Sequence, residues 1–291
     1  MEAVKTGKYG SITQFLAADG LRLSGFLASD TNSPKRCMIF IHGMSSSAFS
    51  SLALSFASGL PRDLALFAIN TRGQGDVTGF SKYTRKRRVR LMAGTRLERF
   101  EDSVFDIKGA IDAISRLGYR NFILCGHSTG CQKVAYYQHK THDRRVKGLV
   151  LIAPCDDYNL ALLGMGHRYA KIRNECSRLI KSGKGNIQLP DNHGFSAQRT
   201  DSIINPKRVE SRLFNYDGSL REFASITVPV LAVFGDMEEN APKRVEKCLE
   251  LLESRTKSRR FTSLLVSGAN HGFEGRQRVL VNSVWKWVSA L

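Results

Sequence analysis

Three features are missing from this sequence, and each absence narrows the class of protein. Within its 291 residues, no uninterrupted apolar run reaches the length of about 18 residues that a membrane-spanning helix needs. The segment 1–10 is polar and basic and lacks the apolar part of a secretory signal peptide. The six cysteines include no C-x-x-C pair. We therefore expect a cytoplasmic protein without a membrane span, whose cysteines are buried free thiols.

Patterns typical of metal sites are equally sparse. The seven histidines are scattered along the chain. His139 and His142 have helical spacing, but they lack an obvious set of acidic or thiol partners in the sequence. We predict neither a metal site nor a cofactor.

Negative charge is scarce compared with positive charge. The chain has 44 Lys and Arg residues against 26 Asp and Glu residues, which gives a formal net charge of +18. The densest basic stretch is 82–90, which reads KYTRKRRVR. It can attract an anionic substrate or partner, or it can simply solvate a surface loop. Because no zinc-finger, RNP-like or helix-turn-helix pattern accompanies it, we predict no specific nucleic-acid binding.

Apolar runs and helical patterns alternate along most of the chain. Runs rich in Ile, Val, Leu and Phe, which we predict to be strands, lie at 37–41, 64–69, 122–125, 149–153, 228–234 and 261–266. Helical patterns lie at about 46–60, 98–117, 129–142, 241–254 and from 275 onwards. Before the first of these runs, 11–17 and 21–28 flank an Asp-Gly turn signal and predict an antiparallel hairpin. The alternation predicts an α/β fold with a mostly parallel sheet covered by helices on both faces.

One segment interrupts this alternation. Between 156 and 225 no strand pattern is found, and apolar residues are spread among charged ones. We predict that 156–225 is a helical cap, inserted into a core made of 1–155 and 226–291. Open α/β sheets bind their ligands at the carboxyl ends of the strands, so we expect the cap to lie over that edge.

The most informative motif is Gly126-His127-Ser128-Thr129-Gly130, which directly follows a predicted strand. It predicts a nucleophile elbow, a strand that turns sharply into a helix with Ser128 at the apex. Glycine is needed on either side because the turn brings strand and helix close together. Ser128 is therefore the candidate nucleophile.

A serine hydroxyl needs a base to remove its proton, and the base needs an acid that orients it. His271 lies in a glycine-flanked loop after the last predicted strand and is the candidate base. The acid is expected earlier in the chain, in the loop after the strand 228–234. We favour Glu238 there and keep Asp236 as the alternative. Glu239 fits better as an acid in the first turn of the next helix.

An acyl-transfer site also needs hydrogen-bond donors for the developing oxyanion, each of which lowers the activation barrier by about 2.7–4 kcal/mol. The segment His42-Gly43-Met44-Ser45 follows the first predicted parallel strand, where one such donor is expected. We predict that the backbone N–H groups of Met44 and Thr129 form the oxyanion hole. His42 is interpreted as a structural loop residue.

On these residues the chain resembles the α/β-hydrolases over nearly all of its length. The resemblance is carried by 42–44, 70–75 (NTRGQG), 126–130, 235–242 and 270–272. More narrowly, 94–102, 126–132 and 196–202 are similar to a poorly characterised subgroup from fungi and plants that includes hydrolases of siderophore esters. The family pattern mostly has Asp as the acid, and this chain departs from it with Glu238. The resemblance implies an α/β-hydrolase fold and a serine hydrolase.

These features predict an enzyme that cleaves a small-molecule carboxylic ester through an acyl-enzyme on Ser128. The same triad can act on a thioester or an amide, or transfer the acyl group to an alcohol, and the sequence does not separate these reactions. A non-catalytic protein that binds a ligand or polyanion on a hydrolase fold is the alternative of another class. An enzyme is favoured because a pure binder does not need a serine, an acid and a histidine in this order. The natural substrate and the oligomeric state stay open.

Overall fold

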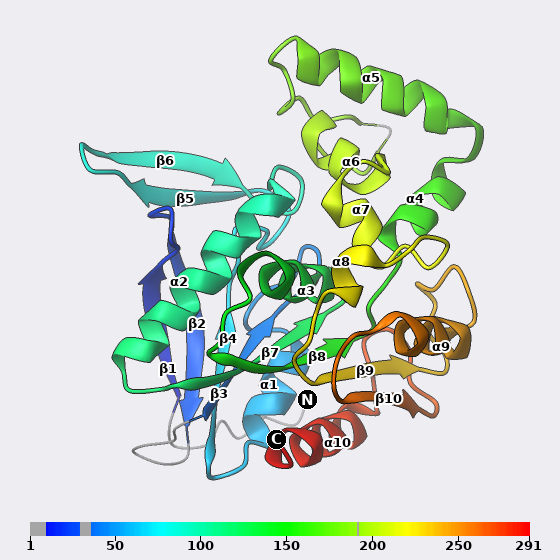
Figure 1. Cartoon of the computed structure of the whole chain (residues 1–291). Helices are drawn as coiled ribbons and strands as arrows, with labels where there is room; N and C mark the ends of the chain where they lie inside the picture. Colours follow the sequence, from blue (N-terminus) through cyan, green and yellow to red (C-terminus); the bar gives the residue numbers. More distant parts are fainter. Residues whose placement is uncertain (1–9, 30–35, 191) are drawn as a thin grey trace.

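Eight strands form one central sheet in the computed structural model, which describes residues 10–29, 36–190 and 192–291 (Figure 1). In order across the sheet they are β1 (Gly10–Leu16), β2 (Arg22–Ser29), β4 (Leu64–Ile69), β3 (Arg36–Ile41), β7 (Asn121–His127), β8 (Val146–Ile152), β9 (Val230–Gly235) and β10 (Phe261–Val266). β1 and β2 form the predicted antiparallel hairpin, and β2 is also antiparallel to β4. Every other neighbouring pair in this sheet is parallel, so the predicted mostly parallel sheet is confirmed.

The central strands are buried along their whole length, as in β4 and β9. A strand that is apolar on both faces needs cover on both. The helices α2 (Ser103–Arg116), α3 (Thr129–Thr141) and α9 (Val245–Arg255) lie on one face, and α1 (Ser51–Ser58) and α10 (Gln277–Ser289) lie on the other (Figure 1). The main hydrophobic core consists of the sheet and these two layers.

The predicted helices exist, but three of them, which start at 51, 103 and 245, begin later than the sequence pattern indicated. The first starts at Ser51 because Ser50 caps it, with the Ser50 hydroxyl accepting from the Ala53 N–H at 3.3 Å. The second is preceded by a 3-10 turn, η1 (Phe100–Asp102). These shifts leave the positions of the helices between the strands unchanged.

All six cysteines are free and buried, as predicted. Burial raises the pKa of the Cys37 and Cys125 thiols, which lie within β3 and β7. No helix in the described part of the chain is long and apolar enough to cross a membrane.

The basic run 82–90 belongs to a second, two-stranded sheet that the sequence analysis did not predict. Its strands are β5 (Thr78–Tyr83) and β6 (Arg88–Ala93), paired antiparallel. In β6, exposed residues alternate with less exposed ones, which is the period of a half-covered strand. The dense charge of the run hid this alternation.

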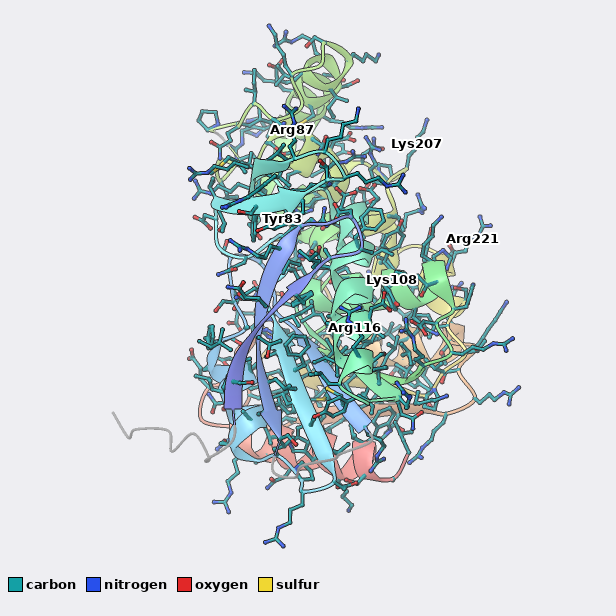
Figure 2. All side chains as sticks on the ribbon, turned by 90° about the vertical axis from the view of Figure 1, so that its left-hand side faces the viewer. Tyr83, Arg87, Lys108, Arg116, Lys207 and Arg221 are labelled. Atoms are coloured by element: carbon teal, nitrogen blue, oxygen red, sulfur yellow. The ribbon has the colours of Figure 1, made fainter. Side chains whose placement is uncertain are left out.

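The basic hairpin projects from the body of the molecule (Figure 1), and Arg87 lies at its end (Figure 2). Lys82 is paired with Asp19, with 2.7 Å between the ammonium nitrogen and a carboxylate oxygen. Arg85, Lys86 and Arg87, by contrast, form no ion pair with any residue that the structure describes. The tip of the hairpin is therefore a solvated cluster of positive charge.

The segment 156–225 lies between β8 and β9 and is mainly helical. Its helices are α4 (Asp157–Met165), η2 (Gly166–Arg168), α5 (Tyr169–Lys181), α6 (Ala197–Ile204), α7 (Val209–Leu213) and α8 (Arg221–Ala224). Within it, the described residues make no strand beyond an isolated bridge between Gln188 and Ser196. A second, smaller cluster of buried apolar side chains lies here, made of Met165, Ile172, Cys176, Leu179, Ala197, Ile203 and Ile204.

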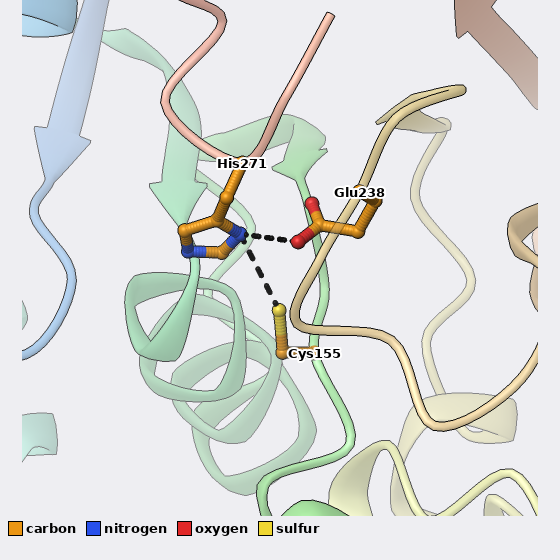
Figure 3. A group of neighbouring side chains, drawn as sticks. All are labelled: Cys155, Glu238 and His271. Carbon is orange, nitrogen blue, oxygen red and sulfur yellow. Dashed lines mark hydrogen bonds and ion pairs between the residues drawn. The ribbon is translucent and has the colours of Figure 1, made fainter.

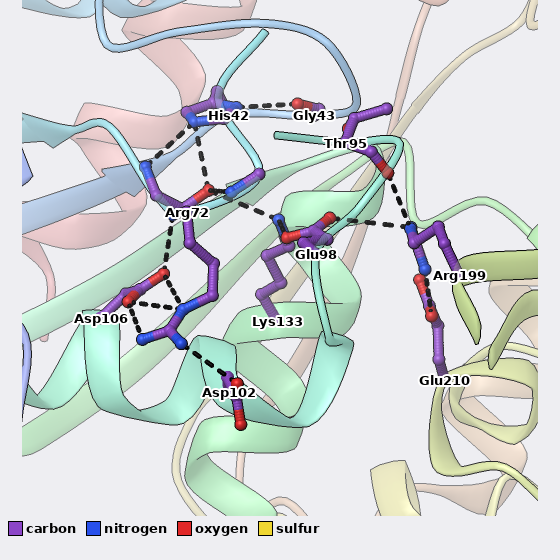
Figure 4. Close-up of polar contacts among 12 residues, drawn as sticks. His42, Gly43, Arg72, Thr95, Glu98, Asp102, Asp106, Lys133, Arg199 and Glu210 are labelled. Carbon is purple, nitrogen blue, oxygen red and sulfur yellow. Dashed lines mark hydrogen bonds and ion pairs between the residues drawn. The ribbon is translucent and has the colours of Figure 1, made fainter. Parts of the chain in front are cut away.

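A chain of buried charges joins this helical segment to the helices over the sheet (Figure 4). Lys133 of α3 donates to Glu98 at 2.8 Å, and Arg199 of α6 approaches the other oxygen of Glu98 at 3.7 Å. Arg199 is also paired with Glu210 of α7, and all four side chains are at most 1% exposed. Burial alone would raise the pKa of Glu98, but Lys133 and Arg199 outweigh it and lower that pKa. Glu98 is therefore ionised in the interior.

We expect Arg199→Met to lower the free energy of unfolding by about 3–5 kcal/mol, because it leaves two buried carboxylates without this partner. Arg178→Met is the matched control, since Arg178 pairs with Glu175 on the exposed side of α5 and such pairs contribute about 0–1 kcal/mol. Urea unfolding of the two variants measures the difference. Equal losses in both would contradict a structural role for the buried charges.

Candidate active site

Ser128 lies at the turn between β7 and α3. Its backbone has φ of 55° and ψ of −127°, a conformation that residues other than glycine rarely adopt. The Ser128 N–H donates to the Ile152 carbonyl at 2.9 Å, and the Cys131 N–H donates to the Ser128 carbonyl at 2.8 Å. The turn thus has the strained strand-to-helix form of a nucleophile elbow.

Three glycines permit this turn. A Cβ on Gly126 would lie 2.4 Å from the Gly130 carbonyl, and a Cβ on Gly130 would lie 2.2 Å from the carbonyl oxygen of Ile41, at the end of β3. A Cβ on Gly43 would lie 2.9 Å from the Cβ of Ser128. Each distance is below any normal van der Waals contact, so only glycine allows the backbone of these segments to meet at Ser128.

The candidate base and acid contact each other directly (Figure 3). Glu238 Oε1 lies 2.8 Å from His271 Nδ1, and the Glu238 side chain is fully buried. A histidine that donates its Nδ1–H to a carboxylate presents Nε2 as a proton acceptor. Asp236 instead accepts from the Ser267 hydroxyl at 3.0 Å and from the Gly268 N–H at 2.7 Å. The structure therefore brings Glu238, and not Asp236, to His271.

Glu239 is not the helix acid that the sequence suggested. The helix α9 begins only at Val245, so Glu239 lies outside its first turn. The Glu239 carboxylate accepts instead from the backbone N–H of His271 at 2.9 Å. That prediction was wrong because the loop after β9 is longer than the pattern indicated. Glu238 thus binds the ring of His271, and Glu239 binds its main chain.

His127 is a further residue of the site that sequence reasoning missed. Its Nε2–H donates to the His271 carbonyl at 2.9 Å, and the two rings lie 4.9 Å apart between centroids. Burial and the nearby His271 lower the pKa of His127 to about 4, so it is neutral at pH 7. The only available signal was its place in the elbow motif, beside the candidate nucleophile.

One cavity of about 320 Å³ brings the predicted residues together. Ser128, His271, Gly43 and Met44 all line it. Thr129 is the first residue of α3, where a helix N–H has no partner within the helix. Neither the Thr129 N–H nor the Met44 N–H donates to another residue in the described part of the chain. Both are thus available to a ligand.

The side chain of His42 contacts the carbonyl group of Gly43 (Figure 4). The Thr71 N–H donates to His42 Nε2 at 3.2 Å, so the ring proton is on Nδ1, which donates to the Gly43 carbonyl at 2.8 Å. Burial and the charge of Lys133 lower the pKa of His42 to about 4. These contacts support the interpretation of His42 as a structural residue.

The same region holds one group of side chains whose ligand atoms are close enough to share a metal ion. Cys155, Glu238 and His271 offer atoms that lie within 4.8 Å of one another (Figure 3). The Cys155 thiol is 3.8 Å from His271 Nδ1, and burial holds its pKa well above the usual range. A protonated thiol is a poor metal ligand, and Nδ1 is already bonded to Glu238. The contacts fit an acid–histidine pair with a thiol packed beside it.

A second cavity, of about 370 Å³, opens beside the first. Met44 lines both cavities, and the rest of the second is formed mainly by α4, α6 and the segment 192–195. Among the residues that the structure describes, Asp157 at the start of α4 supplies its only carboxylate. The candidate site thus continues from Ser128 to the underside of the helical segment.

Comparison with protein families gives one match, to the family described as serine aminopeptidase, S33, over residues 32–274. No curated protein sequence matches the chain.

Solved structures share the fold at low sequence identity. Est1E from Butyrivibrio proteoclasticus with bound ferulic acid has a TM-score of 0.64 at 16% identity, over 96% of this chain and 98% of that chain. The siderophore hydrolase EstB from Aspergillus fumigatus has a TM-score of 0.64 at 18% identity, over 92% and 94%. A soluble variant of monoglyceride lipase from Saccharomyces cerevisiae has a TM-score of 0.65 at 12% identity, over 97% and 96%. The predicted α/β-hydrolase fold is confirmed.

We expect Gly130→Ala to lower the free energy of unfolding by about 3 kcal/mol or more, because its Cβ would collide with the end of β3. Gly164→Ala is the matched control, since Gly164 is also helical and a Cβ added there would meet no atom within 4 Å. That change is expected to raise stability by about 0.5–1 kcal/mol. Chemical unfolding of both variants is the measurement, and a stable Gly130→Ala protein would show that the close approach is not required.

Proposed function

This chain belongs to the family described as serine aminopeptidase, S33, and we propose that it hydrolyses a small-molecule carboxylic ester through an acyl-enzyme on Ser128. The observation that carries the proposal is the hydrogen bond between Glu238 and His271 beside a cavity that both His271 and Ser128 line. Ester hydrolases among the solved structures of this fold, such as the siderophore hydrolase and the monoglyceride lipase, support an ester as the substrate.

The proposed reaction has two halves. Ser128 Oγ attacks the ester carbonyl carbon while His271 Nε2 takes the hydroxyl proton, and the same proton then passes to the departing alcohol. A water molecule, deprotonated by His271, next attacks the acyl-enzyme and releases the acid and free Ser128. Glu238 keeps the Nδ1–H of His271 in place and stabilises the imidazolium that forms in each half.

The oxyanion of each tetrahedral intermediate needs donors that are in place before the reaction. We assign this role to the N–H groups of Met44 and Thr129, which have no other partner in the described part of the chain. His42 supports the assignment, because it fixes the carbonyl of Gly43 and thereby the orientation of the Met44 N–H.

We further propose that residues 156–225 act as a cap over this site. The support is the second cavity, whose walls come from Met44 of the core and from α4 and α6 of the segment. Met44 also packs against the small apolar cluster of the segment. Substrate specificity would then depend on the cap, and catalysis on the core.

The basic hairpin does not line either cavity. Each of its strands has six residues, so its tip lies about 20 Å from its base. An anionic substrate held by these cations in direct contact is therefore not supported. Attraction of anions from a distance stays a prediction.

We expect a fluorophosphonate probe to label the native protein and to leave Ser128→Ala unlabelled, with p-nitrophenyl ester turnover falling by several orders of magnitude in the variant. Ser46→Ala is the matched control, because Ser46 lines the same cavity and its labelling is expected to persist. Absence of labelling in a folded native protein would refute an activated serine.

We expect Glu238→Gln to lower kcat by about 10⁴-fold, because an amide can hold the His271 ring in the wrong tautomer. Asp236→Asn removes the competing carboxylate of the same loop, and a much smaller loss is expected. Steady-state kinetics of both variants on one ester decides between the two acids. A larger loss in Asp236→Asn would reverse the assignment.

A further inference from the structure

The second cavity is largely apolar, and its described lining residues include one carboxylate. Leu160, Met165 and Phe195 contribute apolar walls, and Asp157 is a part-buried residue of the lining. The other ionisable residues of the cavity that the structure describes, Arg168 and His193, are exposed and therefore belong to its opening.

Asp157 is fixed in place by a residue of the elbow helix. Gln132, one helical turn after Ser128, donates to Asp157 Oδ2 at 2.8 Å and to the Cys155 carbonyl at 3.0 Å. Cys155 in turn touches His271. Gln132 thus connects the Asp157 carboxylate to the helix that follows Ser128, and Cys155 connects it to His271.

The carboxylate is only partly satisfied by the protein. Gln132 is its single hydrogen-bond donor among the described residues, and no described cation is paired with it. Arg199, the nearest candidate, is engaged with Glu98 and Glu210. A carboxylate in an apolar cavity needs donors, and here the free oxygen can obtain them only from solvent or from a ligand.

We infer that Asp157 is the residue by which this cavity recognises a substrate with a positively charged hydrogen-bond donor, an ammonium group. The inference rests on the ester hydrolysis proposed above and adds the class of ester to it. The apolar walls bind the carbon chain, and the ammonium group ends against Asp157. A charge-assisted hydrogen bond between these two groups is stronger than one between neutral groups.

The protonation of Asp157 sets the conditions of the test. Burial raises the pKa of Asp157 to about 7, with Glu210 and Asp156 acting in the same direction and Arg199 and His271 opposing them. Above that pH the group is mainly a carboxylate, whereas an alkylammonium with a pKa of about 10 is still charged. Measurements at about pH 8 therefore have both partners in the required state.

The experiment compares ester pairs that differ in one charge. One member ends in a protonated dimethylamino group and the other in an isopropyl group of nearly the same shape, at several chain lengths, placed first on the acyl and then on the alcohol side. We expect the native enzyme to favour the charged member in kcat/KM by about tenfold or more in one of the two series, and Asp157→Asn to abolish that preference. Asp63→Asn is the matched control, since it removes one exposed carboxylate that is paired with Arg36 and lines neither cavity, and the preference of this variant should stay native.

The outcomes separate this inference from the proposed function. Hydrolysis of the neutral esters with no preference in either series would overturn the role of Asp157 and leave the esterase standing. A preference that persists in Asp157→Asn would also overturn it. If the variant does not fold, the comparison of the two esters in the native chain still decides the question. Failure to hydrolyse any ester, together with no fluorophosphonate labelling, would refute the function itself.

Discussion

The contact between backbones at Gly130 is the constraint on which the site depends. The N-terminus of α3 can sit against the end of β3 only because position 130 carries no side chain, with 2.2 Å left for a Cβ. That approach brings the Ser128 side chain against Gly43, the residue before Met44, whose N–H is one of the two proposed oxyanion donors. The proposed nucleophile and donors thus follow two neighbouring parallel strands, and a small shift between the strands would separate them.

The buried charges around Glu98 fix the position of the helical segment 156–225 relative to the core. Lys133 lies on α3, the helix that begins directly after Ser128, Glu98 precedes α2, and Arg199 belongs to α6. A buried charge that loses its partner is costly, so these side chains resist any movement that would separate the helical segment from the core. The second cavity therefore has walls that are fixed to each other by ion pairs as well as by apolar packing.

Much of the fold could be predicted from the sequence because its strongest signals are local. The strands of the sheet are continuous apolar runs, and the elbow is a short motif next to one of them. The residues brought together around Ser128 also follow the predicted order along the chain. By contrast, the roles of His127 and Glu239 depend on backbone contacts with His271, and no periodicity reports such contacts.

The basic hairpin and Asp157 show a second limit of sequence reasoning. The hairpin was not predicted because arginines occupy two of the three exposed positions of β6, so that the run has the composition of a charged loop. Asp157 was not predicted as a site residue, because it lies in a segment rich in charges. It differs from its neighbour Asp156, which caps α4, in that it lines the second cavity. A residue's function here depends on which space its side chain faces, and that is a property of the folded chain.

The net charge of the chain is opposite in sign to the charge of the Asp157 carboxylate in the second cavity. The net charge of +18 suggests affinity for anions, but most of that charge is on the surface, where salt screens it within about 10 Å. A charge inside an apolar cavity is screened far less. The carboxylate of Asp157, in the cavity beside the proposed catalytic residues, can therefore outweigh many distant cations in deciding which ligand is bound. For this protein, the local field of the cavity and not the net charge is the property from which substrate preference should be argued.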